Sequence, residues 1–196
     1  MKSPYGGVWS RACIGLTSYL LCALPAGGEE CSRALRSKPG VIIPPKIVAR
    51  LESIATAFCD EQTKARRQPT TIVVTAGTRS TGEEAALLEQ KLREGSDLGF
   101  YENQAAVQEV RQAYRNRQSI RALLDDQVRR GCFISKHLFD QAADIRNSDM
   151  DDASQSRFVR LTTESGARIV ESEGGVRDHF HLNFPPYLAD PKACPK

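Results

Sequence analysis

The sequence is poor in the residues that mark several large classes of protein. Its 196 residues include only three histidines, and no long run of lysine or arginine accompanies the small formal charge of +3. A mildly basic chain without a basic stripe gives no indication of a nucleic-acid partner. With 40% hydrophobic and 26% charged residues, the composition predicts one globular domain with a sizeable core.

The chain also lacks an uninterrupted apolar run long enough to predict a permanent membrane anchor. The segment "ACIGLTSYLLCALPAGG", residues 12–28, follows Lys2 and Arg11 and is interrupted by Gly, Ser and Pro. This pattern predicts a cleaved export signal over residues 1–28 and a mature domain over residues 29–196, with cleavage after Ala26 as the alternative. We therefore expect an exported protein, periplasmic or extracellular, without a stable membrane anchor. A disordered N-terminal extension is the other interpretation.

No two cysteines have the Cys-x-x-Cys spacing that is typical of structural zinc sites. Removal of the signal would leave an even number of cysteines, namely Cys31, Cys59, Cys132 and Cys194. In an oxidising compartment these four predict two disulfides, and all three pairings are open.

Hydrophobic periodicity predicts an α+β fold, with a small antiparallel sheet flanked by helices. Helices are expected over residues 44–67, 80–95 and 152–166, and a long polar helix with one break over residues 102–130, on the surface of the molecule. Strands are expected at "TTIVVTAG", "CFIS", "QAADI", "ARIVES" and "HFHLNF". The second helix should begin with a capping box formed by Ser80 or Thr81 and a glutamate, and the long helix should end at Gly131.

All three histidines lie in two short segments, "SKHLFDQAADIR" (135–146) and "RDHFHLNF" (177–184). Zinc binds neutral imidazole and carboxylate, and a catalytic zinc site uses three protein ligands. His137, Asp144 and one of the two later histidines provide such a set. Strand alternation places His179 and His181 on one face, so both could point into a common cleft. Neither spacing is specific alone, and a chance arrangement is the alternative.

These segments resemble a known family. "SKHLFDQAAD" is similar to the SxHxxGxAxD signature of the zinc D-alanyl-D-alanine carboxypeptidases and their LAS relatives, which include murein endopeptidases and the hedgehog-type domain. "DHFHLNF" resembles the closing element of that family, and "AGTRS" resembles its SGYRS-type loop, in the same order over about residues 70–184. Two positions depart from the pattern: Asp140 replaces the usual glycine, whose conformation an aspartate tolerates less well, and Thr78 replaces the usual aromatic residue.

The resemblance implies one zinc ion held by His137, Asp144 and His181 on the small sheet of a hedgehog/DD-peptidase type fold. It further implies that Asp178 is the general base for the attacking water and passes the proton to the leaving amine. His179 would be a further catalytic residue, which lies beside the metal without binding it and hydrogen-bonds the oxyanion or the catalytic carboxylate.

Two further residues correspond to positions that contact the substrate in the family. Arg79 would hold a substrate oxygen or carboxylate, and Ser135 would contact the substrate or support the site, although it could equally be a turn residue. Glu171 and Glu173 are alternative bases. Asp140 is expected to be a solvated turn residue instead of a fourth ligand.

By this resemblance the protein is expected to be an exported zinc metallopeptidase that cleaves peptidoglycan stem peptides or their cross-links. Arg79 favours a D-Ala-D-Ala carboxypeptidase, which must bind a terminal carboxylate. The alternatives are a murein endopeptidase of the same fold and a noncatalytic, zinc-containing cell-wall-binding domain. The sequence does not indicate the oligomeric state.

Overall fold

The computed structural model describes residue 31 and residues 33–170 and 179–185. Their centre is a five-stranded sheet of order β1-β2-β3-β5-β4, made of β1 (Leu35–Ser37), β2 (Ile72–Ala76), β3 (Ala142–Arg146), β4 (Arg168–Val170) and β5 (His179–Asn183). The predicted α+β class is confirmed. The sheet is mixed, however, because β1 runs parallel to β2 while the other pairs are antiparallel.

The parallel pair explains why the expectation of a purely antiparallel sheet was wrong. The chain passes from β1 to β2 through the helix α2 (Pro45–Lys64), and a helical crossover returns the chain in the same direction. Pro44 and Pro45 begin this helix as expected, because a proline loses no hydrogen bond in the first turn.

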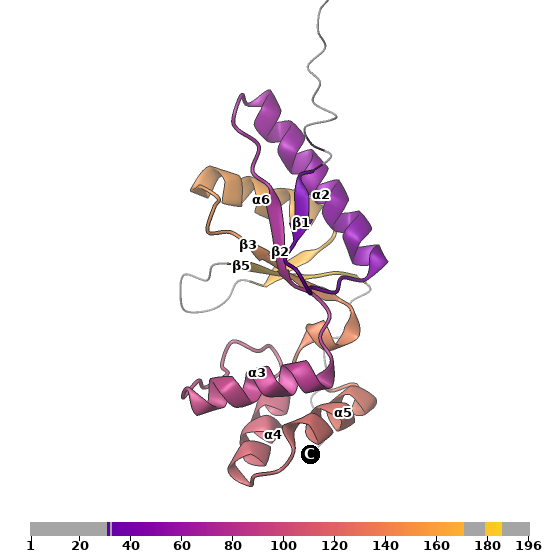
Figure 1. Cartoon of the computed structure of the whole chain (residues 1–196), viewed down its shortest axis with the longest axis vertical. Helices are drawn as coiled ribbons and strands as arrows, with labels where there is room; N and C mark the ends of the chain where they lie inside the picture. Colours follow the sequence, from indigo (N-terminus) through magenta and orange to yellow (C-terminus); the bar gives the residue numbers. More distant parts are fainter. Residues whose placement is uncertain (1–30, 32, 171–178, 186–196) are drawn as a thin grey trace, which may run out of the picture.

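Helices α2 and α6 (Asp152–Glu164) lie on one side of the sheet, and three other helices lie on its opposite side (Figure 1). The side chains between the sheet and the first pair form the larger hydrophobic core. Its fully buried members include Leu51, Phe58, Ile72, Val74, Ile145, Phe158 and Leu182. The larger core therefore lies on the face of the sheet opposite to the face that carries His181.

On the opposite side, a group of three helices packs together beyond the sheet: α3 (Thr81–Arg93), α4 (Gln104–Arg115) and α5 (Ile120–Arg130). The long polar segment breaks once and lies at the surface, as expected, since many residues of its two helices are exposed. Its sparse apolar residues recur at helical spacing and face one another, so they form a second core. The fully buried members of this core include Leu88, Leu98, Val107, Val110 and Leu124.

Helix termini follow the local sequence closely. Ser80 and Glu83 form the predicted capping box of α3, and Gly131 ends α5 in the left-handed conformation with a φ of 72°. The strand expected at "CFIS" is absent. That segment instead leads into a 3₁₀ helix, η1 (Lys136–Phe139), and the carbonyl of Phe133 accepts a hydrogen bond from the Asn103 side chain instead of from a neighbouring strand.

Cys31 and Cys59 form a disulfide that ties the start of the described chain to α2. Cys132 is also disulfide-bonded, and Cys194 lies outside the described residues. One of the two expected disulfides is therefore confirmed, and disulfide formation is compatible with the expected export.

Among the helices that the structure describes, none has the length and apolarity needed to cross a bilayer. The expected signal, residues 1–28, lies outside the described residues.

Candidate metal centre

The register of the sheet brings Asp144 and His181 together. Asp144 of β3 pairs directly with His181 of β5, and His181 pairs with Val170 of β4. Side chains of directly paired residues project from the same face of a sheet. The three therefore form a row across the sheet, on the face opposite the larger core.

The third member of the group, His137, comes from η1 outside the sheet. Ser135 is the N-cap of this short helix, and its hydroxyl accepts a hydrogen bond from the backbone N–H of His137. Nδ1 of His137 lies 2.6 Å from the carbonyl oxygen of Gly77, at the end of β2. A carbonyl oxygen can only accept, so Nδ1 carries a hydrogen and the other ring nitrogen is left to bind. The ring is thus held in one orientation.

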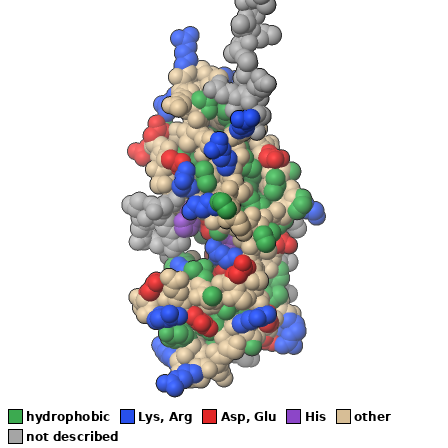
Figure 2. Space-filling view, in the orientation of Figure 1, with side chains coloured by type: hydrophobic (Ala, Val, Ile, Leu, Met, Phe, Trp, Pro, Cys, Tyr) green, Lys and Arg blue, Asp and Glu red, His purple; other side chains and the backbone are tan. Residues whose placement is uncertain are grey.

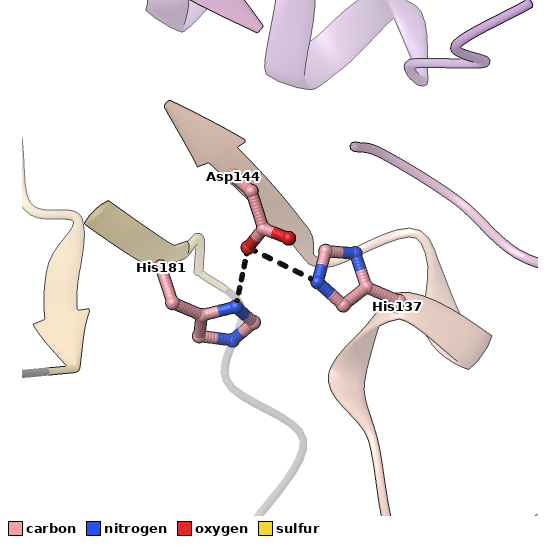
Figure 3. A group of neighbouring side chains, drawn as sticks. All are labelled: His137, Asp144 and His181. Carbon is pink, nitrogen blue, oxygen red and sulfur yellow. Dashed lines mark hydrogen bonds and ion pairs between the residues drawn. The ribbon is translucent and has the colours of Figure 1, made fainter. Parts of the chain in front are cut away.

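Figure 3 shows the two imidazoles converging on one carboxylate oxygen. Nε2 of His137 lies 3.3 Å from Oδ1 of Asp144, and Nδ1 of His181 lies 2.8 Å from the same oxygen. On the far side of its ring, Nε2 of His181 lies 3.1 Å from Oδ1 of Asn183. One donor atom from each of the three residues lies within 4.8 Å of the others, which is a group that could hold a metal ion.

Asp144 is suited to serve as an anionic ligand in this group. Burial by itself raises the pKa of the Asp144 carboxyl, but its interactions with His137 and His181 outweigh burial and hold that pKa well below its usual range. The carboxylate is therefore ionised at neutral pH.

The loop after β2 is fastened to η1 by three hydrogen bonds. Besides the bond between His137 and the Gly77 carbonyl, the backbone N–H of Arg79 donates to the carbonyl of His137, and the hydroxyl of Thr78 donates to Asp140 at 2.6 Å. Thr78 and Asp140 are the two departures from the family pattern, and the structure joins them. Asp140 has a φ of 56°, in the left-handed region that glycine adopts freely. The hydrogen bond to Thr78 is thus available to offset the cost of aspartate at this position.

We expect Asp140→Ala to lower the free energy of unfolding by about 1–2 kcal/mol, because alanine loses the Thr78 hydrogen bond and is disfavoured in the left-handed conformation. Asp140→Gly should cost less, since glycine removes the backbone penalty. Urea unfolding of both variants measures the difference. Thr78→Val is the matched test of the hydrogen bond: it should destabilise the wild type but not the glycine variant, and equal effects in both would contradict the coupling.

Arg79 projects toward the metal group but is held by two carboxylates. Its Nη1 lies 3.0 Å from Oε2 of Glu84, and its Nη2 lies 3.6 Å from Oδ2 of Asp144. Oε1 of Glu84 accepts a hydrogen bond from the hydroxyl of Tyr101 at 3.1 Å. Burial, followed by the charge of Glu84, raises the pKa of Tyr101, so this hydroxyl stays protonated. A continuous polar chain thus runs from Tyr101 to the histidines.

The metal group opens into a cavity of about 500 Å³ between the sheet, helix α3 and residues 100–103 and 133–137. Figure 2 shows histidine atoms at this level, between the two halves of the molecule. The cavity has aromatic and apolar walls, and three cationic side chains also line it, namely Arg79, Lys91 and Lys136. Nζ of the almost fully buried Lys136 is paired with Glu102 at 2.9 Å. A peptide-sized ligand would find both apolar and charged contacts here.

The structure brings together His137, Asp144 and His181, as expected from the sequence. Arg79, Ser135 and His179 line the same cavity. The expected base, Asp178, and the alternatives Glu171 and Glu173 lie outside the described residues.

Sequence reasoning did not identify Glu84, Tyr101 and Lys136 as parts of this region. Glu84 belongs to the glutamates that could close the expected capping box, and Lys136 was given no role. No local pattern distinguishes such residues from solvated ones, because their burial depends on packing between the sheet and the helices.

Comparison of the chain with models of protein families, with curated proteins and with solved structures found no match.

Proposed function

We propose that the protein is an exported zinc metallopeptidase that hydrolyses peptidoglycan stem peptides or their cross-links, most simply as a D-Ala-D-Ala carboxypeptidase. The observation that carries the proposal is the convergence of His137, Asp144 and His181 on a single point at the wall of a peptide-sized cavity. A group of two imidazoles and one carboxylate matches the three-ligand sets of catalytic zinc.

The donor chemistry of the group fits zinc. Nδ1 of His137 donates to a backbone carbonyl, which is the usual outer contact of a metal-binding histidine and leaves Nε2 as the ligand. The ionised carboxylate supplies the negative charge that a divalent cation requires. When bound, zinc would lower the pKa of a coordinated water towards about 7 and polarise a substrate carbonyl.

The surrounding side chains are suited to bind and orient a peptide. Phe100, Phe133 and Val170 contribute apolar walls. The cationic side chains of Arg79 and Lys136 also line the cavity, where each is paired with a carboxylate of the protein. A terminal carboxylate of a stem peptide would have to compete with these partners, so the preference for the carboxypeptidase rests on the resemblance of Arg79 to the family arginine. The assignment to peptidoglycan rests on the sequence resemblance together with the expected export.

A second hollow favours the endopeptidase as the other candidate. It measures about 820 Å³ and lies beside β4 and α6, and Phe100, Tyr101, Glu102 and Val170 line both it and the first cavity. Two hollows with a common wall could accommodate a longer peptide than a carboxypeptidase needs.

Mass analysis of muropeptides after incubation with the zinc-loaded, exported protein tests the proposal. Loss of one terminal D-alanine is the expected result, and conversion of cross-linked dimers to monomers would indicate the endopeptidase. Unchanged muropeptides with zinc bound would contradict both and support the noncatalytic wall-binding domain.

A further inference from the structure

We infer that Glu84 is a positioning residue that holds the guanidinium of Arg79 away from Asp144, and so keeps the Asp144 carboxylate available to a metal ion. The inference rests on the metal site of the proposed function. It concerns metal affinity and not substrate binding.

The distances show an unequal sharing of Arg79 between two carboxylates. Nη1 makes a 3.0 Å charge-assisted hydrogen bond with Glu84, whereas the 3.6 Å from Nη2 to Asp144 is too long for a hydrogen bond. Asp144 therefore keeps Oδ1 for the two histidines and has only a weak contact at Oδ2. The structure thus favours the Glu84 pair over the Asp144 pair.

Glu84 is itself firmly held. Its side chain has no exposed surface, and its second oxygen accepts the hydrogen bond from Tyr101. It lies in the first turn of α3, where the helix dipole stabilises a negative charge. These contacts offset the cost of burying a carboxylate and leave it little freedom to move.

Without the charge on Glu84, Asp144 would be the remaining carboxylate partner of Arg79 among the ion pairs of the described chain. A guanidinium prefers two parallel hydrogen bonds to a single carboxylate. Such a pair would occupy both oxygens of Asp144, and a metal ion would have to displace it. Arg79 would then change from a neighbour of the metal site into a competitor for its anionic ligand.

The test is zinc affinity, measured by competition with a chelator on the full exported protein. Glu84→Gln keeps the size of the side chain and one acceptor oxygen, enough for the hydrogen bond from Tyr101, but removes the charge that holds Arg79. We expect it to weaken zinc binding by about 10- to 100-fold. Glu89→Gln, an exposed position on the same helix, is the matched control and should leave the affinity unchanged.

Substitution of Arg79 in the Glu84→Gln variant distinguishes two causes of weaker zinc binding. Either Arg79 competes with the metal ion for Asp144, or the site has lost the structural support of Glu84. In the Glu84→Gln background, Arg79→Met should restore most of the lost affinity, whereas Arg79→Lys, which keeps the charge, should restore less. If the methionine variant binds zinc no better than Glu84→Gln alone, or if Glu84→Gln binds as tightly as the wild type, the inference is wrong.

The double variant also covers the case in which Glu84→Gln alone does not fold, because it removes both charges together. It should then bind zinc nearly as tightly as the wild type, and clearly weaker binding would show that Arg79 supports the site and that the inference is wrong. Failure of the wild type itself to bind zinc would instead overturn the proposed function. The two failures are therefore distinguishable.

Discussion

His137→Ala is expected to abolish stoichiometric zinc binding and, with it, peptidase activity. His137 is the proposed ligand that lies outside the sheet, and the converging group contains no other nitrogen at its position. If the binding free energy of a zinc site is divided among its ligands, loss of one costs on the order of 100-fold or more in affinity. The Gly77 carbonyl holds the His137 ring in one orientation. A water molecule in place of the ring would lack this support and would be a poor ligand.

Metal analysis of the purified variant measures the outcome. His179→Ala is the matched control, because it removes an imidazole from the same cavity but not from the converging group. It should retain one zinc ion per chain. Full zinc occupancy in His137→Ala would remove His137 from the ligand set, and loss of zinc from the control would exchange the roles of the two histidines of β5.

Asp178→Asn is expected to leave zinc bound but to reduce turnover by about 100- to 10,000-fold, the usual contribution of a positioned general base. Asp178 lies outside the described residues, and its assignment rests on the resemblance of "DHFHLNF" to the family element. Asparagine has nearly the same size as aspartate, so the substitution removes basicity without creating a cavity. Asp144→Asn is the contrasting variant: as a ligand substitution, it should lose zinc.

The measurement combines zinc content with the steady-state rate on a stem peptide. A variant that keeps more than about half of the wild-type rate, far outside the range for a general base, would show that the base lies elsewhere. Glu173 would then be the next residue to substitute. Loss of zinc from Asp178→Asn would instead identify Asp178 as a ligand.

Much of the fold could be predicted from the sequence because it depends on neighbouring residues. The apolar spacing from Ile47 to Phe58 predicted α2, and the capping box at Ser80 and the glycine at 131 placed helix ends within one or two residues. Each of these features requires only the side chains of one turn or one strand.

Predictions that required knowledge of distant partners were less successful. The "CFIS" segment has a strand-like composition. Its Phe133 carbonyl, however, accepts a hydrogen bond from Asn103, the N-cap of α4, and its Ser135 is the N-cap of η1. The parallel pairing of β1 with β2 and the second core among α3, α4 and α5 were also missed. In each case the deciding contacts join segments that are far apart in the chain.

The candidate site combines both kinds of information. The residues themselves pointed to His137, Asp144 and one of the two later histidines, and the resemblance to a known family selected His181. Only the tertiary structure aligned Asp144 with His181 across β3 and β5, joined Thr78 to Asp140, and buried Glu84 against Arg79. Strand register and the docking of α3–α5 bring these partners together, and both depend on the packing of the whole chain, which no short window of sequence contains.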